Sequence, residues 1–152
     1  MNIRLFAPLV AVAAVLGVAA PAQADNVQLL GLTIKWAAVM EKDAGALGPA
    51  VDKGPSQADV AALKLEKDAA RAARAVGAVK PSSSVGLQVR DQLAQALRTY
   101  QASGRELHFA VVAAQRNDSK GATSHVTKAV TLAKTGAAQM TRASLLLKKL
   151  KI

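Results

Sequence analysis

The chain has 152 residues, with 20 lysines and arginines against 10 aspartates and glutamates, and it contains no cysteine. This length fits a single domain. The lack of cysteine excludes disulfide scaffolds, thiol nucleophiles and thiolate zinc sites. The core must therefore be stabilised by packing alone.

The first 24 residues have the features of a secretory signal peptide. Arg4 precedes an apolar run over residues 5–20, and Ala22 and Ala24 stand at the two positions that determine cleavage. The run is shorter than the roughly 18 to 20 apolar residues that a membrane-spanning helix needs. We therefore predict cleavage after Ala24 and a soluble domain over residues 25–152 that is secreted or periplasmic.

The remaining sequence is rich in alanine, the strongest helix former, which favours helices over strands. Prolines and one polar stretch interrupt the periodic pattern, and these breaks are Pro49, Pro55, Pro81 and residues 117–121. Because proline cannot continue a helix, we expect the helices to end near these positions. Four segments of helical length remain, at about 26–47, 56–79, 85–116 and 123–150. The second opens on Ser56, whose hydroxyl we expect to cap that helix.

Each segment carries a seam of apolar and small residues at spacings of three and four. The four seams are Leu29, Thr33, Trp36, Met40, Ala44 and Leu47; Ala62, Leu65, Ala69, Ala72, Val76 and Val79; Val89, Leu93, Ala96, Tyr100, Ser103, Leu107, Val111 and Ala114; and Val126, Val130, Ala133, Ala137, Met140, Ser144 and Leu147. Such seams are typical of helices packed at a shallow angle. We therefore predict an all-α, antiparallel up-and-down bundle of about four helices, with the third segment at its centre. Bulky residues at Gly104 or Ala133 should overpack it.

Basic residues fall on faces opposite these seams, and residues 122–152 carry six of them with no acidic residue. We predict that basic helix faces contact an anionic partner outside the cytoplasm. The candidate contacts are Lys64, Lys67, Arg71, Arg74, Lys128, Arg142 and Lys149. The partner would be an envelope polymer, a membrane surface or an acidic protein, and nucleic acid remains an open alternative. The competing interpretation is a solvated face that keeps an alanine-rich bundle soluble.

Two further features have two interpretations each. Phe109, with Arg105 and Arg116 nearby, has the form of a stacking platform for bases or sugars, but the need for two buried flanks on a central helix favours a core position. The cationic and apolar run over residues 145–152 would form a membrane-surface foot or pack against the first helix.

The sequence lacks the motifs of catalysis. His108 and His125 have no zinc-binding spacing, and no nucleophile elbow, phosphate loop or di-iron carboxylate pattern is present. We therefore predict a non-catalytic protein without a metal or cofactor. The alternative function is a carrier that holds an apolar small molecule or haem between helices, using Trp36, Met40, Tyr100 and Met140, with the two histidines as further ligands. A structural protein that completes its seams between chains is a third interpretation.

Overall fold

The structure is a computed structural model that describes residues 21–150, with side chains from Asp25 onward. This part of the chain forms four helices and no strand: α1 (Pro21–Asp52), α2 (Pro55–Gly77), α3 (Ser84–Gln115) and α4 (Ser119–Leu147). The prediction of an all-α helical bundle is confirmed for these residues. The predicted signal peptide lies outside the described residues, apart from the backbone of residues 21–24, which opens α1.

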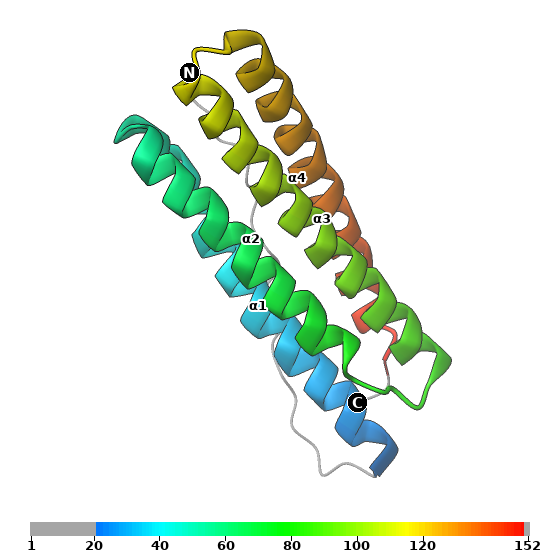
Figure 1. The fold of residues 1–152 in the computed structure, drawn as a ribbon. Helices are drawn as coiled ribbons and strands as arrows, with labels where there is room; N and C mark the ends of the chain where they lie inside the picture. The colour runs from blue at the N-terminus through cyan, green and yellow to red at the C-terminus, as the bar shows by residue number, and fades with distance from the viewer. Residues whose placement is uncertain (1–20, 151–152) are drawn as a thin grey trace.

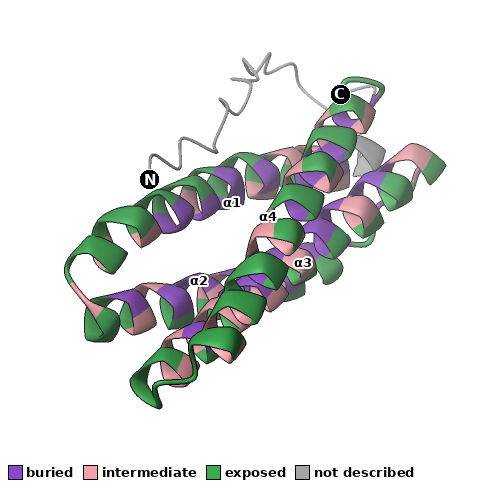
Figure 2. Ribbon diagram, turned by 90° about the horizontal axis from the view of Figure 1, so that it is seen from above, coloured by how far each residue is buried: buried purple, intermediate pink, exposed green. Residues whose placement is uncertain are grey.

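The helices pack in two pairs, with α1 beside α2 and α3 beside α4, as Figures 1 and 2 show. The most extensive interface joins α3 to α4, and the next joins α3 to α2. By contrast, α1 packs mainly on α2 and touches α3 only slightly. The third segment is therefore the central helix, as the sequence predicts, and α2 and α4 lie on either side of it.

Short connections with defined caps separate the helices. Gly54 precedes α2 with a φ of 106°, a conformation that favours glycine, and Pro55 follows at the first helical position, where no N–H is needed. The Ser83 hydroxyl accepts from the Gly86 N–H at the start of α3. The Asp118 carboxylate accepts from the Gly121 N–H at the start of α4. The prediction of Ser56 as a cap is wrong, because the cap position of α2 is Gly54, without a side-chain hydrogen bond.

The first helix is longer than the sequence predicts. The break expected at Pro49 does not occur, because α1 continues through it to Asp52. Proline removes one helical hydrogen bond, but Pro49 is exposed and close to the end of the helix. Water can therefore reach the carbonyl that loses its partner.

One continuous core joins all four helices, and Figure 2 shows its buried residues on the facing sides of the ribbons. Its larger members are Leu29, Trp36, Met40, Leu65, Val76, Val89, Leu93, Leu97, Tyr100, Met140 and Leu147. The alanines between them let neighbouring helices approach closely. The seams of the first two segments are confirmed, with every member buried except the half-buried Leu47. The third seam is confirmed from Val89 to Ser103 and becomes more exposed beyond that point.

The seam predicted for the last segment is partly wrong. Val126 is 43% exposed, whereas Ala129 and Gly136 are buried against α3. Two contacts fix this face of α4: the Ser103 hydroxyl donates to the Ala129 carbonyl at 2.9 Å, and Gly136 lies against the Tyr100 ring. The smallest residues are buried because they permit the closest approach of two backbones, and a hydrophobicity pattern does not detect that preference.

Burial in this core raises the pKa of Tyr100 above its ordinary value of 10.0. The fold therefore favours the neutral phenol, so its contribution to stability is complete below pH 10 and is lost as the pH rises through the raised pKa. We expect Tyr100→Phe to reduce the loss of stability in strong alkali. Since the chain has a single tyrosine, tyrosinate absorbance measures the titration directly. A tyrosine that ionises at its ordinary pKa while the helices stay intact would contradict this burial.

Candidate functional site

Three of the candidate contacts on α2 form a free basic face. Lys67, Arg71 and Arg74 are exposed, and none forms an ion pair with a carboxylate of the described residues. Their spacing of three and four residues places them together on the side of α2 opposite its buried seam. A ligand in solvent can therefore reach all three cations at once.

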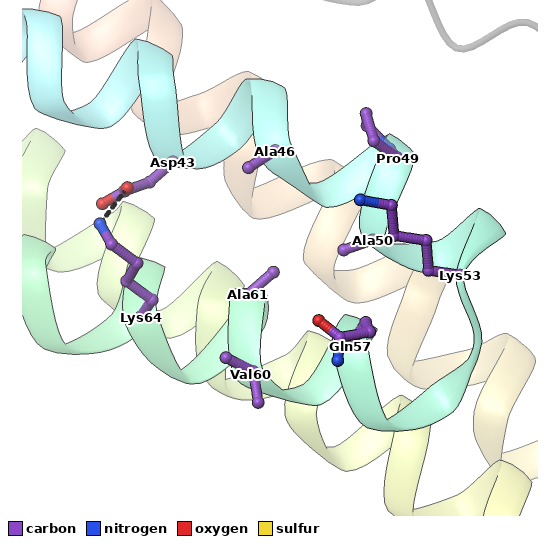
Figure 3. Close-up of a pocket in the computed structure, with 9 residues that line it drawn as sticks. All are labelled: Asp43, Ala46, Pro49, Ala50, Lys53, Gln57, Val60, Ala61 and Lys64. Carbon is purple, nitrogen blue, oxygen red and sulfur yellow. Dashed lines mark hydrogen bonds and ion pairs between the residues drawn. The ribbon is translucent and has the colours of Figure 1, made fainter.

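Lys64 differs from these three residues, because its ammonium is used within the fold. It forms ion pairs with Asp43 on α1 and with Asp68 one turn along α2, as Figure 3 shows for the first of them. The hydrogen bond to Asp43, followed by the one to Asp68, raises the pKa of Lys64. The same contact from Lys64 lowers the pKa of Asp68. Two carboxylates thus compensate this cation, and less of its charge remains for an external partner.

The candidates on α4 are also exposed. Lys128 and Arg142 on α4 and Lys149 in the turn just after it are exposed, and α4 contains no acidic residue. Because α3 lies between α2 and α4, the two helices form no extensive interface with each other. The structure therefore places the predicted contacts on two separate helices. Lys128 also lies far along α4 from Arg142 and Lys149.

A hollow of about 300 Å³ lies between the end of α1 and the start of α2. Figure 3 shows the Asp43–Lys64 pair at one end of it and Lys53 with Gln57 at the other. Between these polar ends its walls are formed by the apolar side chains of Ala46, Pro49, Ala50, Val60 and Ala61. This hollow could not be predicted from the sequence, because its lining comes from two helices that the seams alone do not align.

Two histidine–carboxylate pairs flank Phe109 on the bundle surface. The His108 Nδ1 lies 2.5 Å from the Asp59 Oδ1 and links α3 to α2, while the His125 Nδ1 lies 2.6 Å from the Glu106 Oε2 and links α4 to α3. The Phe109 ring contacts both imidazoles, with centroid separations of 5.8 and 5.6 Å. Phe109 is itself 42% exposed. The expectation that it forms a core edge is therefore wrong.

The residues named for the carrier alternative do not lie together. Trp36, Met40, Tyr100 and Met140 are buried in the common core, whereas the two histidines are half-buried at the surface beside Phe109. The described hollow is lined by none of these six residues. The hollow between α1 and α2 therefore gives no support to the carrier alternative.

Within residues 21–150 no helix combines the length and hydropathy needed to cross a membrane. The same part of the chain contains no cluster of three or more histidines, aspartates or glutamates suited to a metal ion. No protein-family model, curated protein or solved structure matches this chain.

Proposed function

We propose that this is an exported, non-catalytic helical-bundle protein that binds an anionic partner outside the cytoplasm through basic faces of α2 and α4. The proposal is supported by the exposure of six of the candidate cations and by their lack of an ion-pair partner within residues 21–150. Lys67, Arg71, Arg74, Lys128, Arg142 and Lys149 are exposed without an ion-pair partner among the described residues. Unpaired exposed cations attract polyanions, because binding releases the counterions of the polymer.

The proposal includes export and an antiparallel arrangement of the helices. Export rests on the sequence of residues 1–24, with its basic start, apolar run and small residues before the cleavage position. The antiparallel arrangement is supported by contacts in which a later residue of one helix meets an earlier residue of the next. Glu66 pairs with Arg105 while Asp59 meets His108, and Thr99 meets Gln139 while Glu106 meets His125.

We expect the logarithm of the binding constant for an anionic polymer such as heparin to fall linearly with the logarithm of the salt concentration. In the triple variant Lys67→Gln, Arg71→Gln, Arg74→Gln, the slope should fall by about three, because each contact contributes about one released counterion. The matched control is Lys42→Gln, which removes an exposed cation of α1 outside the proposed faces. Affinity measured by titration across a range of salt concentrations gives both slopes. Binding that ignores ionic strength, or equal slopes for the triple variant and the parent, would contradict the proposal.

A further inference from the structure

The positive charge of the bundle is concentrated at one end of its long axis. We call this the basic end and define it as residues 25–32, 70–91 and 141–150. Figure 1 shows the α2–α3 connection and the C-terminal end of α4 together there. Arg90, near the start of α3, donates to the Val79 carbonyl of that connection. Seven cations lie in the basic end, and they are Arg71, Arg74, Lys80, Arg90, Arg142, Lys148 and Lys149.

Acidic residues do not balance these cations. The basic end contains only Asp25 and Asp91 among its described residues, and Asp91 pairs with Arg90. At the opposite end, residues 45–62 and 108–126 carry three cations and three carboxylates. These six are Lys53, Arg116, Lys120, Asp52, Asp59 and Asp118. The net charge of the bundle is therefore asymmetric along its axis, which the stripes on single helices did not reveal.

The basic end also exposes two leucines. Leu145 is 55% exposed and Leu87 is 39% exposed. Arg142, Lys148 and Lys149 stand three or four residues from Leu145 along the helix and its following turn, so they surround it on one surface. A single exposed leucine is common. A leucine framed by three uncompensated cations offers apolar and ionic contacts to the same partner.

We infer that the basic end binds the surface of an anionic lipid bilayer, an inference that rests on the proposed function and names its partner. The guanidinium and ammonium groups would lie among lipid phosphates, each contributing about fivefold to partitioning near such a surface. Leu145 would enter the boundary between headgroups and acyl chains. A soluble polyanion such as nucleic acid offers phosphates but no apolar layer, so it would leave the leucine contact unused.

Binding to vesicles tests this inference. The probes are vesicles of phosphatidylcholine alone and vesicles of equal parts phosphatidylcholine and phosphatidylglycerol, with bound protein measured by co-sedimentation. We expect the triple variant Arg142→Gln, Lys148→Gln, Lys149→Gln to partition about 100-fold less strongly to the anionic vesicles. Leu145→Gln should partition roughly tenfold less strongly, since it removes a largely exposed apolar side chain from the interface.

The matched controls come from the opposite end of the bundle. Lys53→Gln, Arg116→Gln, Lys120→Gln removes the same charge there, and Leu63→Gln removes a 41% exposed leucine of α2 that directly follows residues 45–62. Both should retain parental partitioning. All proteins are made in the same form, so any contribution of residues 1–24 is common to them, and circular dichroism verifies equal helicity.

Each outcome has a distinct meaning. Selective loss in the variants of the basic end supports the inference. Equal loss in both charge variants overturns the assignment to this end. If Leu145→Gln binds vesicles like the parent and the protein binds heparin in a salt-dependent manner, a soluble polyanion is the partner, so the inference fails while the proposed function stands. The absence of salt-dependent binding to vesicles and heparin alike would overturn both.

Discussion

Replacing Gly104 by alanine should lower the free energy of unfolding by about 1 to 3 kcal/mol, the usual cost of an overpacked core. A methyl carbon at this position would lie 2.8 Å from the Glu66 amide nitrogen and 2.9 Å from the Ala62 carbonyl oxygen. Both are backbone atoms that cannot rotate away, so α2 and α3 would have to separate. Separation would weaken the Glu66–Arg105 ion pair and the Asp59–His108 contact on either side of the glycine. Gly104→Leu should be more severe.

The matched control is Gly31→Ala on α1. Apart from its chain neighbours and the adjacent backbone of α1, no atom lies within 4 Å of the position that its methyl carbon would take, and alanine is favoured over glycine in a helix by up to about 1 kcal/mol. We therefore expect Gly31→Ala to be neutral or stabilising in thermal and urea unfolding followed by circular dichroism. If Gly104→Ala unfolds at the same midpoint as the control, the close approach of α2 and α3 at this position is incorrect.

The seams of α1 and α2 follow from the sequence because large side chains mark the buried face. Leu29, Trp36 and Met40 on α1, with Leu65 and Val76 on α2, recur at helical spacing and are all buried. Hydrophobic burial scales with apolar area, so a helix turns its largest apolar residues inward. Where such residues define one face, periodicity alone predicts the packing.

The same reasoning fails on α4, where three of the five buried residues are alanine or glycine. There the buried positions include Ala129, Gly136 and Ala143, which are chosen by how closely α4 approaches α3. The Ser103 hydroxyl on the Ala129 carbonyl adds a polar contact that no hydrophobicity pattern contains. Ala133, which the seam placed in the core, is only half-buried. We therefore expect a smaller cost for Ala133→Leu than for Gly104→Leu.

Candidate contacts can be predicted from the sequence as exposed cations, but their partners cannot. The stripe on α2 includes Lys64 by spacing alone, and only the packing of α1 on α2 brings Asp43 to its ammonium. Likewise, the end of α2, the α2–α3 connection and the end of α4 each carry basic residues, and these residues lie at one end only because the three segments meet there. Pairing and clustering are properties of tertiary structure, and single-helix periodicity carries no information about them.

Removal of Lys64 tests its ion-pair partner Asp43, the most deeply buried carboxylate of the described residues. The Asp43 side chain is 3% exposed, and its Oδ2 has no hydrogen-bond partner. In Lys64→Met this carboxylate loses its counterion. Breaking a fully buried pair costs about 3 to 5 kcal/mol, and we expect about 2 kcal/mol here because Lys64 is half-exposed and water would partly replace it. Lys67→Met, an exposed lysine one turn away without an ion pair, is the matched control and should change stability little.

A double-mutant cycle separates the ion pair from the packing of the lysine stem. Asp43→Asn combined with Lys64→Met should be more stable than Lys64→Met alone, since the uncompensated charge is gone. The pH dependence of stability follows from the pKa shifts of Lys64 and Asp68. The raised pKa of Lys64 means that its contribution is complete below pH 10.5 and is lost as the pH rises through the raised pKa. The lowered pKa of Asp68 means that its contribution is present above pH 3.8 and is lost in stronger acid. If the single and double variants unfold at the same midpoint, Asp43 carries no buried charge.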